Sequence, residues 1–248
     1  MASTSETGHA KNVANFEDLI SFCTGYGTAY NPSKAAIQLP ALNTLYSNAQ
    51  NALAGLTSSK IVFDNATNAR QAAFEPLKKL ATRIVNALDA TEATDALLKD
   101  ARTINSKIQG KRSGKLTKAD AGITEDEPTE TAKTISVSQQ RFDSLIENFA
   151  KLIELVGSEP SYTPNEPELQ VSTLTTTLNN LKTTNTGVVN SYTNYSNTRI
   201  TRDSILYATN SGLVDTALEV KKYVKSVFGA TSPQFKQVSG LEFKKRKK

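Results

Sequence analysis

The chain has very few of the side chains on which most active sites and metal sites depend. Its 248 residues include one histidine, His9, one cysteine, Cys23, one methionine and no tryptophan. A metal site built on several histidines and an internal disulfide are therefore excluded, and a catalytic triad has no support. Cys23 lies in the apolar stretch LISFCTGYG and is predicted to be a small core residue. We expect no enzyme activity, no catalytic residues, no metal and no cofactor.

Long apolar runs are absent as well. No stretch approaches the 18 apolar residues typical of a membrane-spanning helix. The first residues, MASTSETGHAKN, have no charged segment followed by an apolar one, so they do not resemble a signal peptide. A single cysteine also fits a reducing compartment. We expect a soluble, cytoplasmic protein, with secretion by a signal-independent route as the open alternative.

Basic residues are in excess, but the excess lies at one end of the chain. The formal net charge is +5, and each of the last five residues is basic. The other 243 residues carry 24 basic and 24 acidic side chains, so the body is neutral. A short basic tail attracts nucleic acid or anionic lipid weakly and without sequence preference. The candidate anion-binding residues are Lys244, Lys245, Arg246, Lys247 and Lys248.

The charges in the middle of the chain are segregated by sign. Residues 107–118 contain five basic side chains, and residues 120–130 contain five acidic ones. Such neighbouring blocks, with glycine and proline close by, are typical of a solvated linker. The motif QGKRSGKLT at 109–117 resembles a phosphate-binding loop, but it lacks the required glycine spacing, the Ser or Thr after the lysine, and a preceding strand. We expect it to bind no nucleotide.

The sequence contains an internal repeat. When residues 30–70 are aligned with residues 132 positions later, ten of the 41 pairs are identical, against roughly two or three expected by chance. The match extends in both directions when short gaps are allowed. The identical pairs are Tyr30/Tyr162, Pro32/Pro164, Gln38/Gln170, Leu42/Leu174, Thr44/Thr176, Asn48/Asn180, Gly55/Gly187, Ser59/Ser191, Asn65/Asn197 and Arg70/Arg202.

This repeat predicts a tandem duplication with five segments. They are a flexible N-terminus (1–10), a first helical repeat (11–109), a charged linker (110–135), a second helical repeat (136–242) and a basic tail (243–248). The predicted fold is all-α, with two helical-bundle units related by a pseudo-twofold axis.

Each repeat is predicted to contain one long helix with a heptad, coiled-coil-like pattern. In the second repeat, apolar and aromatic residues fall at 171, 174, 178, 181, 188, 192 and 195. In the first repeat the helix is predicted over 33–72, starting after Pro32 and continuing through Gly55, with a hairpin near 57–59 as the alternative. Shorter helices are predicted at about 76–90, 91–109 and 212–228, with only a turn or two at 232–243.

Six polar and aromatic residues recur in both repeats and are the candidate interaction residues. Structural residues at bends and caps would recur in any duplicated bundle, and this is the favoured interpretation. Tyrosine and arginine are also frequent in binding hot spots, so a pair of equivalent interaction sites is the alternative. The residues are Tyr30, Asn65, Arg70, Tyr162, Asn197 and Arg202.

Three segments of the sequence look like an uncharacterised bacterial family of all-helical, soluble proteins with no assigned activity. They are FDSLIENFAKLIELV, YTPNEPELQVSTL and GLVDTALEVKKYVKSVFGATSPQFKQVSGLEF, and the resemblance covers most of the chain from Gly8 to Phe243. It implies a natural helical protein and transfers no site residue.

The leading functional hypothesis is a non-catalytic structural or interaction protein. It would self-associate, or scaffold another protein, through the faces of its long helices. The alternative is a nucleic-acid-associated protein that uses the basic tail and the 107–118 block. A helical pore-former or membrane-surface protein is the third hypothesis, and it would need an exposed apolar hairpin that the sequence does not offer.

Overall fold

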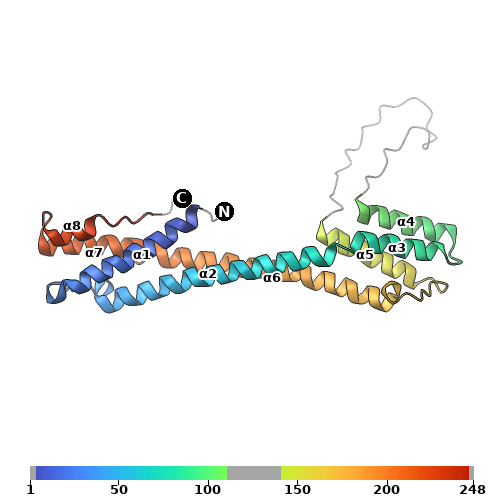
Figure 1. Ribbon diagram of the computed structural model, residues 1–248, viewed down its shortest axis with the longest axis horizontal. Coiled ribbons are helices and arrows are strands. Elements are labelled where there is room, and N and C mark those ends of the chain that lie inside the picture. The colour runs from blue at the N-terminus through green and yellow to red at the C-terminus, as the bar shows by residue number, and fades with distance from the viewer. Residues whose placement is uncertain (1–3, 111–140, 246–248) are drawn as a thin grey trace, which may run out of the picture. The chain divides into compact units, whose positions relative to one another are not determined.

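A computed structural model describes residues 4–110 and 141–245, and the described residues form helices and loops without any strand. The predicted all-α class is therefore confirmed for them (Figure 1). Most of the predicted linker, 111–135, and residues 246–248 lie outside the described residues. The elements in chain order are α1 (Thr4–Gly25), η1 (Gly27–Ala29), η2 (Ala35–Ile37), α2 (Leu39–Phe74), α3 (Leu77–Asp89), α4 (Asp95–Gln109), α5 (Phe142–Gly157), η3 (Pro167–Leu169), α6 (Val171–Tyr207), α7 (Leu213–Phe228) and α8 (Pro233–Ser239), where η marks a 3-10 turn.

The chain divides into two compact units, one built from the two ends of the sequence and one from its middle. Unit 1 comprises residues 1–64 and 190–248, and unit 2 comprises residues 65–189. Each unit therefore takes one part from the predicted repeat 11–109 and one part from the predicted repeat 136–242. The boundaries of the compact units do not coincide with those of the sequence repeats, because α2 and α6 are each divided between the two units.

Unit 1 buries the apolar faces of α1 and α7 against parts of α2 and α6. In Figure 1, α1, α7 and α8 lie together, and α7 contacts both α1 and α8. Turn η2 also packs on α7. The core of this unit contains the fully buried side chains Phe16, Leu19, Cys23, Leu42, Leu206, Leu213 and Val220.

Unit 2 is built in a comparable way from α3, α4 and α5. Helix α4 packs against both α3 and α5, and turn η3 packs on α3. Parts of α2 and α6 complete the core. The side chains that are fully buried in this unit include Ile84, Leu88, Ile108, Phe149, Leu152, Leu174 and Leu181.

Each long helix is continuous through its central glycine. Helix α2 runs through Gly55 and α6 through Gly187, which confirms the prediction of single long helices and rules out the hairpin. Both helices start later than predicted, about seven residues after the proline. The intervening residues form an extended lead-in and a 3-10 turn, so Pro32 belongs to this lead-in and not to the first helical turn.

Burial along the long helices follows the predicted spacing in some places and departs from it in others. In α2, the buried residues Leu42, Ala49 and Leu56 are seven positions apart. In α6, Tyr192 is 54% exposed, and the neighbouring Ser191 is buried in its place. Part of the buried face is therefore polar, which a search for apolar residues alone does not detect.

The shorter helices begin and end close to the positions that the sequence indicates. The Thr94 hydroxyl accepts a hydrogen bond from the Leu97 amide at 3.3 Å and caps α4. Gly110 ends the same helix with a φ of 77°, a left-handed conformation that glycine adopts without strain. Helix α7 ends before Gly229, which has a φ of 90°. The predictions at 76–90 and 212–228 are thus confirmed to within one residue at each end, and the helix predicted at 91–109 is present but begins at Asp95.

The N-terminal segment differs from its prediction. Residues 1–10 were expected to be flexible, but α1 already begins at Thr4. His9 lies within this helix and is only 6% exposed. His9 and Asn12 of this helix make polar contacts with Tyr207 and the Lys244 backbone, which are far away in the chain, so no local pattern reveals them.

Candidate functional site

Tyr30 and Tyr162 hold corresponding loops in the same conformation. The Tyr30 hydroxyl donates to the Ile37 carbonyl at 2.5 Å, and the Tyr162 hydroxyl donates to the Leu169 carbonyl at 3.0 Å. Both rings are 6% exposed. A buried hydrogen bond of this kind contributes about 1 kcal/mol. Both tyrosines therefore connect the start of a lead-in loop to the turn before a long helix.

Burial of these rings changes their acid–base properties. Burial, and to a smaller extent the Glu166 carboxylate, raises the pKa of Tyr162 to about 12. Burial also raises the pKa of Tyr30, and the neighbouring Cys23 thiol adds to this effect. The prediction that Cys23 is a core residue is confirmed, because its side chain is 0% exposed. Burial raises the pKa of its thiol to about 12, so the reactive thiolate is rare at neutral pH.

Of the two recurring arginines, Arg202 is buried and Arg70 is half-buried. Arg202 is 2% exposed, and its Nε and Nη2 atoms lie 3.0 and 2.7 Å from Oδ1 of Asp203. The Arg70 guanidinium lies 4.0 Å from the centre of the Phe142 ring and donates to Asn185 Oδ1 at 3.1 Å. The stacking and hydrogen bond of Arg70 connect α2 to α5 and α6 within unit 2, and the burial of Arg202 leaves it inaccessible to an external ligand.

The six recurring residues are distributed over the two units and do not form one site. Unit 1 holds Tyr30 with Asn197 and Arg202, and unit 2 holds Tyr162 with Asn65 and Arg70. Each unit thus combines the tyrosine of one repeat with the asparagine and arginine of the other. Both asparagines are exposed, and the Asn197 carbonyl accepts a hydrogen bond from Thr201 within α6.

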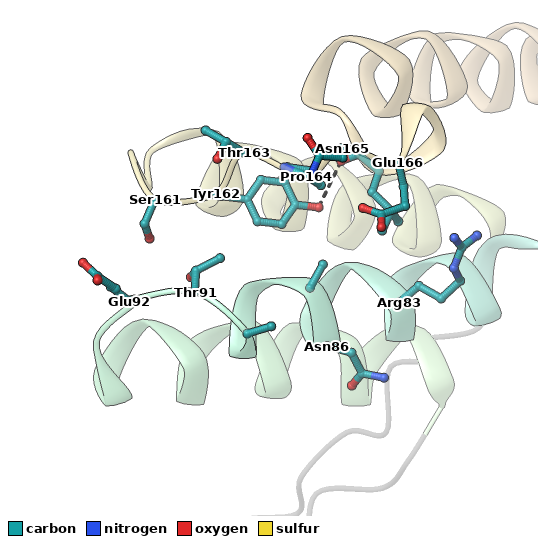
Figure 2. A pocket seen from close by; sticks show the side chains of 13 residues that line it. Arg83, Asn86, Thr91, Glu92, Ser161, Tyr162, Thr163, Pro164, Asn165 and Glu166 are labelled. Carbon is teal, nitrogen blue, oxygen red and sulfur yellow. Dashed lines mark hydrogen bonds between the residues drawn. The ribbon is translucent and has the colours of Figure 1, made fainter.

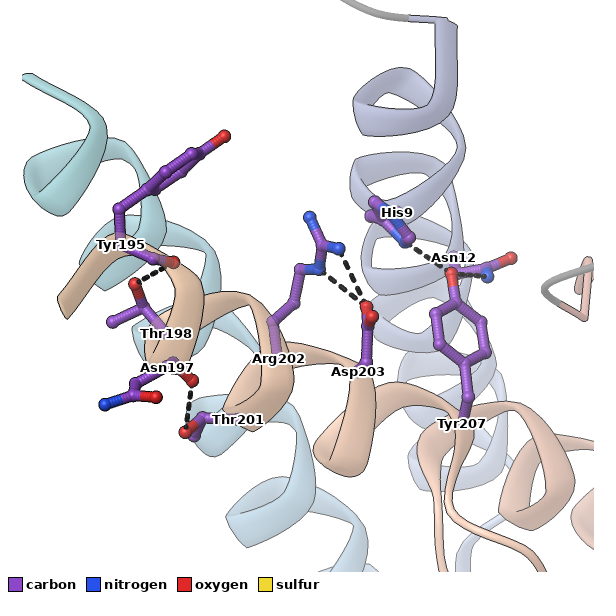
Figure 3. A network of polar contacts seen from close by, with 9 residues as sticks. All are labelled: His9, Asn12, Tyr195, Asn197, Thr198, Thr201, Arg202, Asp203 and Tyr207. Carbon is purple, nitrogen blue, oxygen red and sulfur yellow. Dashed lines mark hydrogen bonds and ion pairs between the residues drawn. The ribbon is translucent and has the colours of Figure 1, made fainter. Parts of the chain in front are cut away.

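A polar network in unit 1 contains the single histidine. Figure 3 shows His9 and Asn12 of α1 directed at the hydroxyl of Tyr207, which lies at the end of α6. The His9 Nδ1 atom lies 2.5 Å from this hydroxyl, and Asn12 Nδ2 donates to it at 3.3 Å. Arg202 and Asp203 lie one to two turns earlier on the same helix. Since both His9 and Asn12 are buried, their hydrogen bonds offset the cost of removing them from water.

Asn12 also fixes the end of the chain. Its side-chain amide donates to the Lys244 carbonyl at 3.0 Å and accepts from the Lys244 amide at 3.0 Å. The Lys221 ammonium donates to the carbonyls of Ser239 and Leu241. Residues 240–245 are therefore bound along unit 1 by α1 and α7, not free of it.

The predicted basic tail is thus only partly described. The Lys245 ammonium lies 2.7 Å from an Asp215 carboxylate oxygen, and this pairing, as the largest cause, lowers the pKa of Asp215. Lys244 is held through its backbone. The other predicted anion-binding residues, Arg246, Lys247 and Lys248, lie outside the described residues.

Unit 2 contains an open pocket of about 720 Å³ between α3 and the loop before η3. Figure 2 shows Arg83 at one end, Glu92 at the other, and the Tyr162 ring facing α3 across the gap. Arg83 Nη2 donates to Glu168 at 2.7 Å, and this bond is the main cause that lowers the pKa of Glu168. The polar residues that line the pocket include Arg83, Asn86, Thr91, Glu92, Ser161, Thr163 and Glu166. Sequence analysis gave no indication of this pocket.

Large apolar side chains are exposed on the long helices. In unit 1, Ile61 and Val62 of α2 are 54% and 53% exposed, and Tyr192 and Ile200 of α6 are 54% and 65% exposed. Phe63 joins the two helices, because its ring is stacked on Tyr195 with centres 6.0 Å apart. In unit 2, Val189 of α6 is 58% exposed.

The described part of the chain was searched for groups of metal-ligating side chains and for membrane-spanning helices. Residues 4–110 and 141–245 contain no group of three or more His, Cys, Asp or Glu side chains that could hold a metal ion. Within the same ranges, no helix has both the length and the apolar character that crossing a bilayer requires.

Comparison with known proteins adds no relative. No family model, no curated protein and no solved structure matches the chain. The resemblance to an uncharacterised bacterial family therefore stays an expectation.

Proposed function

We propose that the protein is a non-catalytic structural or interaction protein that associates through the faces of its long helices, with a second copy or with another protein. The observation that carries this proposal is the exposure of Ile61, Val62, Tyr192 and Ile200, each more than half exposed, on two helices of unit 1. Soluble proteins expose scattered apolar residues, but several large apolar side chains exposed on two helices that contact each other through Phe63 and Tyr195 favour a helical partner.

The internal repeat supports a self-associating design and is part of the proposal. Two features recur 132 residues apart: the tyrosine-to-carbonyl hydrogen bonds of Tyr30 and Tyr162, and the 3-10 turns η2 and η3. We propose that the two halves arose by duplication and pack with pseudo-twofold symmetry. Most oligomers of identical chains are symmetric, and the twofold dimer is the commonest form. A bacterial, cytoplasmic setting completes the proposal.

Light scattering coupled to size-exclusion chromatography tests self-association. We expect a mass above the monomer value of 26.8 kDa that rises with concentration and persists at high salt, because apolar contacts are not screened. The variant Ile200→Lys should lower the mass toward the monomer. The matched control Asn194→Lys places the same charge at an exposed polar position of α6 and should leave the mass unchanged. A wild-type chain that stays monomeric at all concentrations would overturn self-association.

Binding of nucleic acid through the basic tail is the alternative proposal. The pairing of Lys245 with Asp215 reduces the charge that the described part of the tail can offer. Deletion of residues 244–248 at about 50 mM salt tests it, since tail-mediated binding would be lost and would also fall steeply as salt rises.

A further inference from the structure

Residues 240–245 follow α8 and lie along α1 and α7 of unit 1; we call them the strap. In Figure 1 the strap runs from α8 back toward the first turns of α1. Its side chains alternate, since Leu241 and Phe243 are half-buried against the core of unit 1, whereas Glu242 and Lys244 are exposed. A period of two is that of an extended peptide. The strap therefore binds to unit 1 as an extended peptide ligand would.

The contacts of the strap are made mainly to its backbone. The Asn12 side chain donates to the Lys244 carbonyl and accepts from the Lys244 amide, both at 3.0 Å. Asn15 Nδ2 donates to the Glu242 carbonyl at 2.7 Å, and Lys221 of α7 donates to a further strap carbonyl. Proteins that bind extended peptides commonly use backbone hydrogen bonds together with alternating side-chain anchors. The strap-binding surface of α1 and α7 thus has the features of a peptide-binding site.

The charges of the strap also match those of the surface. The Lys245 ammonium lies 2.7 Å from an Asp215 carboxylate oxygen, and the Lys11 ammonium lies 4.0 Å from a Glu242 carboxylate oxygen. Exposed ion pairs of this kind add little affinity, but they select a partner by the order of its charges. The surface therefore fits a segment with an acidic residue between two apolar anchors and basic residues after them, and the strap itself is such a segment.

Unit 2 covers the corresponding place with a helix. Helix α4 packs on α3 and α5 as α8 packs on α7 and α1, and Leu98 and Val238, which align at a shift of 140, are both buried. Beyond this pair α4 continues and buries Ala101 and Ile108 completely, whereas α8 ends at Ser239. The strap continues from there with anchors that are only half-buried. Release of the strap therefore exposes less apolar surface than release of α4, and the strap is the more easily displaced of the two.

We propose that the surface of α1 and α7 binds the strap of a second copy of this chain, and that two copies exchange their straps. A second copy supplies the same anchors, backbone groups and order of charges, so the exchanged contacts are those seen within one copy. Exchange of an identical element between two copies closes a twofold dimer without any new kind of contact. The strap of the same chain competes at a high effective concentration, so exchanged dimers form a minor species. This inference goes beyond the association through the long helices, because it involves α1, α7 and the strap.

The experiment traps strap exchange between two full-length variants. One carries Lys11→Cys, the other carries Glu242→Cys, and both carry Cys23→Ala, so that each has a single thiol. A short bismaleimide joins thiols at these neighbouring positions, and a product that links position 11 to position 242 forms only between copies. We expect this product to accumulate about tenfold faster than in a mixture in which Asn194→Cys, at an exposed position of α6, replaces Lys11→Cys, since bound neighbours react at a raised effective concentration.

Further variants separate exchange between copies from the contact within one copy. A chain with both Lys11→Cys and Glu242→Cys should cross-link within itself, which checks that the variant folds and that the strap lies on α1. Adding Phe243→Asp to the Glu242→Cys copy removes an anchor and should abolish the product between copies, whereas Phe243→Leu should keep it. No 11–242 product between copies, an equal rate with Asn194→Cys, or an unchanged rate with Phe243→Asp would overturn the proposal. Ile200→Lys should leave the product in place, so strap exchange and helix-face association can fail separately.

Discussion

Single residues show how one side-chain type takes different roles in the two repeats. Arg70 and Arg202 occupy equivalent sequence positions, yet Arg70 stacks on Phe142 while Arg202 is buried beside Asp203. Tyr30 and Tyr162 instead keep the same hydrogen bond. Both tyrosines find their acceptor seven residues later in the chain, whereas the Asp203 that pairs with Arg202 is replaced by Gln71 after Arg70. Recurrence in sequence therefore predicts a shared role best where the bonding partner recurs as well.

Cys23 allows a direct test of burial at this scale. Because the thiol is buried and its pKa is raised to about 12, we expect labelling by a disulfide reagent at pH 8 to be at least about 100-fold slower in the native chain than in denaturant. As the only cysteine, it gives an unambiguous signal. Rapid labelling of the native protein would contradict the packing of α1 described above.

The same thiol contributes to the pH dependence of stability. Its pKa rises from 9.0 to about 12 on folding, so its contribution is complete below pH 9 and is lost as the pH rises toward 12. We expect the free energy of unfolding of Cys23→Ala to fall less steeply over this range than that of the wild type. Parallel curves would show that the thiol is not buried as described.

At the scale of elements, the sequence indicated where several helices end, but not which distant residues they contact. Gly110 and Gly229 specify their helix ends through backbone preference, so the sequence alone located them, whereas α4 starts four residues later than predicted, after the Thr94 cap. The start of α2 was missed because Pro32 belongs to an extended loop in which the Tyr30 hydroxyl bonds the Ile37 carbonyl, and not to the first helical turn. The His9 network and the Tyr162 pocket were missed because they join residues that are far apart in the chain.

Replacement of the central glycines of the long helices by alanine should stabilise the protein. A β-carbon at Gly55 or Gly187 would meet no heavy atom within 4 Å. Alanine costs less conformational entropy than glycine in a helix, so Gly55→Ala and Gly187→Ala should each raise the free energy of unfolding by about 0.5–1 kcal/mol. Urea denaturation followed by circular dichroism measures this. The comparison variant Gly110→Ala should lose about 1 kcal/mol, because its φ is 77°. A loss in both helix variants would indicate that the glycines accommodate a partner.

At the scale of the whole molecule, the sequence predicted two repeats, while the compact units combine halves of both. Apolar periodicity indicates which face of α1 or α3 is buried, but not which helix covers it. When two repeats are similar, each face fits its own repeat and the other one almost equally well. In unit 1, α1 of the first repeat packs on α7 of the second, and in unit 2, α5 of the second repeat packs on α3 of the first.

Because each compact unit combines helices of both sequence repeats, we expect that the two halves of the chain do not fold separately. Residues 1–110 contain α1 to α4 but lack α5 and α7, against which α3 and α1 are packed. We therefore expect the isolated fragment 1–110 to lose the cooperative unfolding transition of the full chain. Without the helices that cover its apolar core, the fragment buries too little apolar surface to offset the conformational entropy lost on folding. Mixing it with the fragment 111–248 should restore a cooperative transition and a complex of one copy of each. Circular dichroism and light scattering measure both changes. If the fragment 1–110 unfolds cooperatively as a monomer, each sequence repeat is an independent domain, and the exchanged packing of the two units is wrong.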